Sequence, residues 1–340
     1  MGIINIRDLK KTYTTYERGS SFLDTVKSLF VRKPIDIEAL KGITLNIEEG
    51  ELLGFLGPNG AGKSTTLKIL TGVLFPTSGE VDVMGYTPWK QRKAYVARIG
   101  AVFGQKSQLI WDIPPLDSFE MNRAIYGIPS QDYKRRLDEM TQMLSLENII
   151  KKPTRQLSLG ERMKCEFIMA MLHAPRIVFL DEPTIGLDVI AKERIRDFIL
   201  EQNRRGVTFI LTTHDLGDVE QLARRVVVVN YGEIVFDDTV ESLRRLSGIK
   251  KRVELATKRE LPDLSDMSGV QLTGRTSSCH AELELDMEQL ELNRFLQHVN
   301  QNYIISDLTM SDPPIESVIK ELYTQKEKQP LRLIAQPEII

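Results

Sequence analysis

Nine consecutive residues have the types and spacing needed to hold a phosphate group. They are Gly57, Pro58, Asn59, Gly60, Ala61, Gly62, Lys63, Ser64 and Thr65. An apolar run typical of a strand precedes them, and residues 66–70 favour a helix. Glycines let backbone N–H groups turn inward around an anion, and the helix N-terminus adds free N–H groups and a positive dipole end. This context predicts a P-loop that binds a nucleoside triphosphate, with Lys63 on the β- and γ-phosphates and the Ser64 hydroxyl on Mg²⁺.

Two adjacent carboxylates follow a second apolar run. Residues 177–180 are fully apolar, which predicts a buried parallel strand, and Asp181 and Glu182 come directly after it. Ligands in open α/β sheets bind at the carboxyl ends of the strands. A carboxylate pair at that place, in a chain that also carries a P-loop, indicates a functional site in preference to a solvated surface.

The elements that must position these residues alternate between strands and helices, which predicts a doubly wound, mostly parallel sheet. Strands are expected at 3–7, 43–47, 80–84, 99–103, 208–212, 226–229 and 234–236, the last two joined by a hairpin turn at Tyr231-Gly232. The N-terminal strands and residues 80–84 would form an antiparallel part. Helices are expected within 116–150, interrupted at Pro129, and at 157–172.

The pattern changes near residue 246. Strands are expected at 252–256, 270–272, 281–285 and 304–308, and helices at 290–299 and 315–323. We therefore expect a main domain over 1–245, a small α+β accessory domain over 246–325, and a loose tail over 326–340.

Composition excludes several classes of protein. The chain has 340 residues, a net charge of −2 and two cysteines, Cys165 and Cys279. No overall positive field favours nucleic acid, and the few cysteines favour a reducing compartment. The N-terminus does not read as a secretory signal, and no stretch approaches the roughly eighteen apolar residues of a membrane helix. If the protein works at a membrane, we expect the spanning part in another chain.

A segment over residues 14–38 looks inserted. Phe22, Val26, Leu29 and Phe30 would lie on one face of a helix, with Pro34 ending it. Two interpretations stay open: an amphipathic helix on a membrane or a partner, and a helix packed on its own domain.

Six motifs in order make residues 1–245 resemble the nucleotide-binding domain of ABC transporters. They are the P-loop at 57–65, Gln105, the signature-like residues 157–161, residues 177–182, residues 186–188, and His214. The resemblance implies a RecA-like core, an antiparallel β-subdomain and a helical subdomain at about 106–172. It also implies ATP and Mg²⁺ as ligands, ATP hydrolysis, and a head-to-tail dimer with a second nucleotide-binding subunit, as a homodimer or with a close paralogue.

The resemblance also assigns roles to single residues. Asp181 would hold Mg²⁺ through a water, with Ser64 and Gln105 at the metal; Glu182 would accept a proton from the attacking water; His214 would contact the γ-phosphate. Tyr13 would stack on the adenine, and Asp188 would contact the opposite subunit. Ser158 and Gly160 would grip the γ-phosphate in the partner's site.

The signature departs from the family at two positions. Leu159 and Glu161 stand where the family usually has glycine and glutamine. Because Ser158 and Glu161 have the spacing of a capping box, we expect Glu161 to cap its own helix.

A closer resemblance is to the ATP-binding subunits of ABC-2-type exporters. It rests on residues 157–163, on Trp111-Asp112 with 117–119, and on 183–188; the insertion resembles that of polysaccharide exporters, and residues 305–308 with 315–316 resemble the tail of drug exporters. It implies an ATPase motor, peripheral on the cytoplasmic face of the membrane, that drives a separate permease. Trp111, Ile113 and Leu116 are candidate permease contacts or internal packing residues.

Two alternatives remain. One is a soluble ABC ATPase acting on the ribosome or DNA, for which the chain lacks a second such domain, a basic linker and a coiled coil. The other is a non-catalytic regulatory subunit, against which Lys63, Asp181, Glu182 and His214 speak.

Overall fold

The computed structural model describes residues 2–16, 34–104, 106–213, 216–245, 250–259 and 267–312, together with residues 319 and 322. The chain divides into two compact units, the first ending at Asp238 and the second beginning at Thr239.

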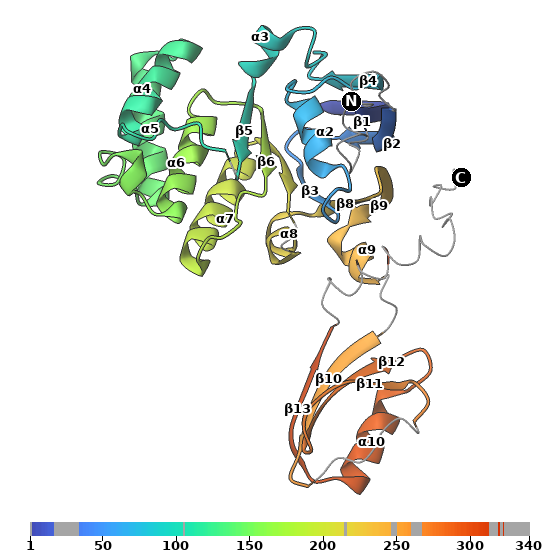
Figure 1. Ribbon diagram of the computed structural model, residues 1–340. Coiled ribbons are helices and arrows are strands. Elements are labelled where there is room, and N and C mark those ends of the chain that lie inside the picture. The colour runs from blue at the N-terminus through green and yellow to red at the C-terminus, as the bar shows by residue number, and fades with distance from the viewer. Residues whose placement is uncertain are drawn as a thin grey trace, which may run out of the picture. The chain divides into compact units, whose positions relative to one another are not determined.

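The first unit is built on a six-stranded sheet with the order β5-β6-β7-β3-β8-β9 (Figure 1). Its strands are β3 (Leu52–Leu56), β5 (Ile99–Phe103), β6 (Ile177–Asp181), β7 (Thr208–Thr212), β8 (Arg225–Asn230) and β9 (Glu233–Thr239). The ladders from β5 to β8 are parallel. Every residue of β3 and the first four residues of β6 are buried, as their apolar runs predicted. Tyr231 and Gly232 have φ of 49° and 79°, which the tight turn before β9 requires, so the predicted hairpin is confirmed.

The helices of this unit are α2 (Lys63–Leu70), α3 (Arg92–Val96), α4 (Pro115–Tyr126), α5 (Ser130–Leu144), α6 (Leu159–Met171), α7 (Val189–Arg204) and α8 (Leu216–Leu222), with a short 3-10 turn at Thr154–Gln156. In Figure 1, α4, α5 and α6 gather on one side of the sheet. The interruption expected at Pro129 is present, because Gly127 ends α4 with φ of 63° and Pro129 precedes α5. Within the described residues, none of these helices combines the length and apolar character of a membrane span.

A separate antiparallel sheet has the order β2-β1-β4, with β1 at Ile4–Tyr16, β2 at Pro34–Ile47 and β4 at Ser78–Val83. The strand limits expected at 3–7 and 43–47 were wrong, since β1 and β2 pair as far as Tyr16 and Pro34. The reason is local. Asp8 has φ of 46°, and the register shifts between Ile6 and Leu9. This bulge interrupts the alternation that marks a strand in sequence.

The helix expected around Phe22 to Phe30 lies outside the described residues, because β1 ends at Tyr16 and β2 starts at Pro34.

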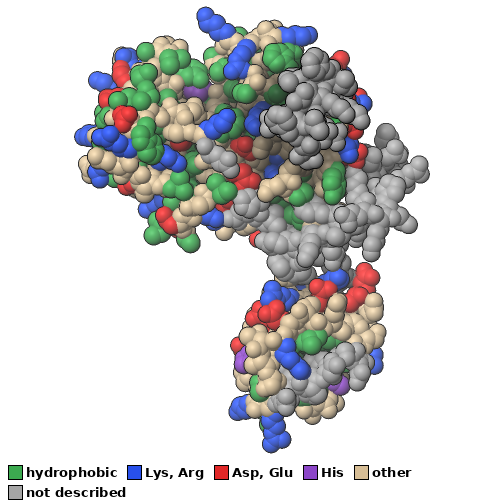
Figure 2. Space-filling model, in the orientation of Figure 1, with side chains coloured by type: hydrophobic (Ala, Val, Ile, Leu, Met, Phe, Trp, Pro, Cys, Tyr) green, Lys and Arg blue, Asp and Glu red, His purple; other side chains and the backbone are tan. Residues whose placement is uncertain are grey.

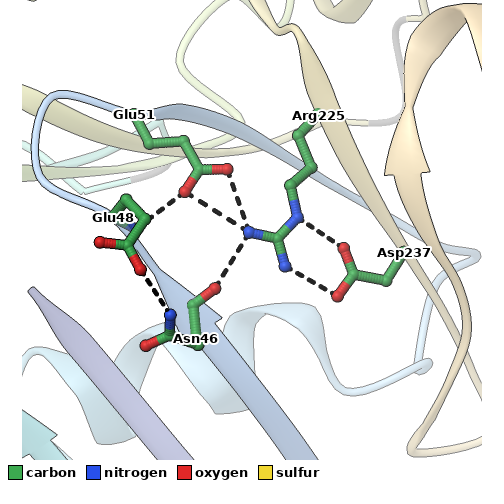
Figure 3. Close-up of polar contacts among 5 residues, drawn as sticks. All are labelled: Asn46, Glu48, Glu51, Arg225 and Asp237. Atoms are coloured by element: carbon green, nitrogen blue, oxygen red, sulfur yellow. Dashed lines mark hydrogen bonds and ion pairs between the residues drawn. The ribbon is translucent and has the colours of Figure 1, made fainter. Parts of the chain in front are cut away.

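One arginine joins three parts of the first unit (Figure 3). Arg225, the first residue of β8, makes two hydrogen bonds to Asp237 of β9 at 2.6 and 2.8 Å. Its Nη1 also donates to Glu51 at 3.1 Å and to the carbonyl oxygen of Asn46, the last but one residue of β2, at 3.0 Å. Paired guanidinium–carboxylate bonds are directional, so this residue fixes the edge of the parallel sheet against the antiparallel sheet.

The second unit begins with α9 (Val240–Arg245). Four antiparallel strands follow in the order β11-β12-β10-β13, with β10 at Lys250–Thr257, β11 at Val270–Ser277, β12 at His280–Asp286 and β13 at Ile305–Ser311. Helix α10 (Leu292–Asn302) contributes Phe295 and Val299 to a core shared with Val253, Leu283 and Leu285. The expected strands and the first expected helix are therefore present, while the helix expected at 315–323 falls almost entirely outside the described residues.

Candidate functional site

The P-loop connects the end of β3 to α2, which begins at Lys63 as the sequence predicted. Gly62 precedes the helix with φ of 109°. A Cβ at this position would lie 2.8 Å from the carbonyl oxygen of Ala39, so both the backbone angle and the space require glycine. The loop can therefore present its N–H groups and the N-terminus of α2 on one side.

Lys63 holds its ammonium group inside this loop. Its Nζ donates to the carbonyl oxygens of Gly57 at 2.6 Å and Pro58 at 3.2 Å. Burial lowers the pKa of Lys63, and the nearby carboxylates of Glu182 and Asp181 partly oppose that shift. A buried cation beside a glycine loop is suited to an anionic ligand.

Asp181 receives two hydroxyl donors at the carboxyl end of β6. Ser64 Oγ lies 3.0 Å from Asp181 Oδ1, and Thr212 Oγ1 at the end of β7 lies 2.6 Å from the same oxygen. Hydroxyl and carboxylate oxygens are the ligands that Mg²⁺ prefers, completed by water and substrate phosphate. The residues present therefore fit this ion: Ser64 and Asp181 would hold it, and it would neutralise phosphate charge.

Glu182 follows with φ of 54°, and its backbone N–H donates to the Thr212 carbonyl at 3.0 Å. The end of β5 packs closely on this turn. The Gly104 N–H donates to the Asp181 carbonyl at 2.8 Å, and a Cβ on Gly104 would lie 2.3 Å from the Glu182 carbonyl oxygen. The loop after β5 is therefore fixed against the two carboxylates.

These groups surround one cavity of about 760 Å³, a size that suits a nucleotide. Its lining consists of Gly57, Pro58, Asn59, Gly60, Ala61, Gly62, Lys63, Ser64, Thr65, Lys68, Val73, Phe103, Gly104, Lys106, Asp181, Glu182 and Ile185. The structure thus brings the whole predicted P-loop together with both predicted carboxylates.

Other expected site residues do not line this cavity. Ser158 caps α6, and the capping box is complete: Glu161 N–H donates to Ser158 Oγ at 3.2 Å, and Ser158 N–H donates to Glu161 Oε2 at 2.8 Å. The expected role of Glu161 as a cap is confirmed. Gly160 packs against Ala191, whose N–H donates to Asp188, the N-cap of α7, at 2.8 Å.

Tyr13 lies on β1 with 40% of its surface exposed, and the Lys11 ammonium group lies 5.2 Å from its ring centroid. It is not among the residues that line the cavity. Gln105 and His214 lie outside the described residues, so their roles stay predictions.

Sequence reasoning missed three polar residues at the site. Thr212 binds Asp181, and Lys68 and Lys106 line the cavity. The strand ending at Thr212 was expected, but its place beside β6 was not. Lys68 lies five residues into α2, and Lys106 lies just beyond β5.

Comparison with known proteins gives the family of the chain. The family model described as "ABC transporter" matches residues 40–185. The ABC transporter ATP-binding protein NatA of Bacillus subtilis (strain 168) is 30% identical over 207 residues, which cover 61% of this chain and 84% of NatA. The daunorubicin resistance ATP-binding protein DrrA3 of Streptomyces coeruleorubidus is 32% identical over 213 residues, covering 63% of this chain and 67% of DrrA3. The methionine import ATP-binding protein MetN 2 of Enterococcus faecalis also matches, with 33% identity over 220 residues that cover 63% of this chain and 64% of MetN 2.

Solved structures agree. The ATP-binding cassette MJ0796, in a dimeric post-hydrolysis state bound to ADP and Pi, superposes with a TM-score of 0.58 and 27% identity over 70% of this chain and 98% of that cassette. The predicted fold class is confirmed. A P-loop cavity with two carboxylates, on the fold of these cassettes and with sequence similarity to their subunits, leads to one conclusion: this chain belongs to the ABC transporter ATP-binding proteins, which hydrolyse ATP to drive transport.

Proposed function

We propose that this chain is the motor subunit of an ABC-2-type exporter, in which ATP closes a head-to-tail dimer and hydrolysis opens it. The observation that carries the proposal is that the predicted ATP-binding residues do not all lie in one cavity. The P-loop, Asp181 and Glu182 share one cavity, while Ser158 at the start of α6 is not among its lining residues. A second subunit that brings its own Ser158 and Gly160 to the triphosphate would complete each site.

Within this dimer the residues have distinct tasks. Lys63 and the P-loop N–H groups bind the phosphates, and Ser64 and Asp181 hold Mg²⁺. Glu182 orients the attacking water and takes its proton. Gln105 senses the metal, His214 contacts the γ-phosphate, Tyr13 stacks on the base, and Asp188 meets the other subunit.

The proposed partner is a permease in a separate chain, which places this subunit at the cytoplasmic face of the membrane. Support comes from large exposed apolar side chains of the first unit: Val73 (57% exposed) and Phe75 (60%) after α2, Trp111 (54%), and Ile125 (74%) on α4. Such residues are typical of an interaction surface. Of the expected contacts, Trp111 is exposed, whereas Ile113 and Leu116 are half-buried.

Surface charge gives no support to a nucleic-acid partner. On the face in Figure 2, Lys and Arg side chains are interspersed with Asp and Glu. A nucleic-acid footprint would need positive charge gathered on one face. Export as the direction is supported by the similarity to a daunorubicin resistance protein.

The test is Glu182→Gln, which removes the base but keeps every phosphate-binding group. Turnover should fall at least a hundredfold, within the usual range for a lost general base, and ATP should convert the variant to a dimer on gel filtration. Glu193→Gln on the exposed face of α7 is the matched control and should behave as wild type. A Glu182→Gln variant that stays monomeric at saturating ATP would refute the dimer.

Permease coupling needs its own measurement. The chain should sediment with membranes when its permease is co-expressed and remain soluble without it. Soluble behaviour in both cases, with RNA bound, would favour the ribosomal alternative.

A further inference from the structure

A buried carboxylate lies in the middle of α6 and is not among the residues that line the ATP cavity. Glu166 is 3% exposed, and no salt bridge is formed by it within the part of the chain that the structure describes. Burial raises the pKa of Glu166, and hydrogen bonds from Ser107, Gln108 and Leu109, with the charge of Arg162, act in the opposite direction. A buried carboxylate without a paired cation needs strong hydrogen-bond donors, and here one short segment supplies them.

That segment is residues 107–109, which begins two residues after Gln105. Ser107 Oγ donates to Glu166 Oε1 at 2.5 Å, and the Gln108 N–H lies 3.1 Å from each carboxylate oxygen. The Leu109 N–H adds a long contact at 3.5 Å. Three consecutive residues are thus bound to a single side chain.

A second contact joins the same helix to the same loop one turn earlier. The Arg162 guanidinium lies 5.9 Å from the ring centroid of Trp111, within reach of a cation–π interaction. Since Arg162 and Glu166 are four residues apart, they lie on one face of α6. The helix therefore holds residues 107–111, which we call the linking segment, at two points.

Helix α6 and the linking segment together connect two groups that have different roles in the proposed cycle. Helix α6 starts at Ser158, the group proposed to grip the partner's triphosphate, and the linking segment follows Gln105 and ends at the exposed Trp111. A rigid helix transmits a displacement of its N-terminus to whatever is bonded to its side.

We propose that Glu166 is a positioning residue that makes α6 and the linking segment move as one body, so that engagement of Ser158 by a second subunit's ATP is transmitted to the permease-facing loop. This inference rests on the proposed dimer. If Glu166 only helped α6 to pack, its loss would not affect how ATP-driven dimer formation reaches the linking segment. A structural role and a coupling role can therefore be told apart.

Trp111 itself can report the transfer. The chain has two tryptophans, and Trp89 can be replaced by phenylalanine, since it is partly buried against the apolar core and its ring lies against Phe75. In a Trp89→Phe, Glu182→Gln parent, saturating Mg-ATP should produce the dimer on gel filtration and change the Trp111 emission. Adding Glu166→Gln should remove most of that change, while the ATP affinity, the dimer and the melting temperature stay close to the parent's. Glutamine keeps the shape but places an amide donor against the Gln108 N–H.

Lys164→Met is the matched control. Lys164 lies on the same helix, but its Nζ donates to the Leu144 carbonyl at 3.0 Å, at the end of α5. This variant should keep the full Trp111 response. If the Glu166→Gln variant has a lowered melting temperature, Ser107→Ala is the substitute test. It removes only the hydrogen bond from Ser107 to Glu166 and should partly lower the ATP-induced change in Trp111 emission.

A full Trp111 response in a folded Glu166→Gln variant, or in Ser107→Ala if the former does not fold, would overturn the linkage while leaving the dimer intact. A parent that binds ATP but never dimerises would overturn the proposed dimer, and the linkage with it.

Discussion

At the scale of single residues, the site depends on groups that meet from two strands and a helix. Asp181 ends β6 and is bound by Ser64 from α2 and Thr212 from β7. Because Asp181 Oδ1 accepts both hydroxyl groups, its position, where we propose that Mg²⁺ binds, is fixed before any ligand arrives. Lys63 is fixed similarly by the carbonyls of its own loop.

Lys63→Ala is expected to weaken ATP binding directly. Loss of a buried, charge-assisted contact to phosphate should raise the Kd for ATP by at least tenfold, or about 1.4 kcal/mol. Titration with a fluorescent ATP analogue measures this. Lys68→Ala provides the control, since Lys68 also lines the cavity but is exposed on α2. An equal loss in both variants would mean that general positive charge, not the position of Lys63, binds the nucleotide.

At the scale of elements, the start of α6 is defined by a reciprocal cap. Ser158 and Glu161 each satisfy a backbone N–H of the other residue. The acidic residue at a position where the family usually has glutamine is therefore compatible with the fold, because both side chains can accept the same hydrogen bond. Leu159, the other departure, is 39% exposed, and a Cβ built on Gly186 would lie 3.2 Å from its Cδ2.

Glu161→Ala should destabilise the first unit by about 1 kcal/mol, the usual cost of a lost cap. The expected fall in melting temperature is roughly 2–4 °C for a unit of this size. Glu161→Gln should restore the cap and melt near wild type. If both variants melt equally early, the charge at the helix N-terminus stabilises α6 and the capping bond does not.

At the scale of the whole molecule, the two units have separate cores. The core of the first contains Phe55, Ile69 and Phe179, whereas that of the second contains Val253, Leu283 and Phe295, and the two clusters share no residue. Arg225 and Asp237 fasten β9 just before the division at Asp238. Each unit therefore buries apolar side chains in a hydrophobic core of its own, which can stabilise it.

A chain shortened to residues 1–245 should fold and bind ATP with an affinity within about threefold of the full chain, a difference below 1 kcal/mol. This cut keeps β9 and α9, the first helix of the second unit, and removes that unit's four strands and α10. Calorimetry should show that one melting transition disappears while the ATP-stabilised one remains. Loss of ATP binding in a folded shortened chain would contradict the independence of the two units.

Local sequence determined much of the molecule. The P-loop, the apolar runs of β3 and β6, the turn at Tyr231-Gly232, the break at Pro129 and the cap of α6 are all encoded within a few residues, so their physical requirements are visible in one stretch. The presence of Asp181 and Glu182 at a strand end followed from the same reasoning.

Tertiary structure decided what depends on contacts between distant segments. The bulge at Asp8 concealed the true length of β1, and only the order of the sheet placed Thr212 beside Asp181. Glu166 reads in sequence as one more charged helix residue, yet it is buried and bound to Ser107, 59 positions away. The periodicity of a sequence indicates which face of a helix or strand is buried, because it depends on neighbouring residues. Which distant element covers that face depends on contacts that form only when the chain folds.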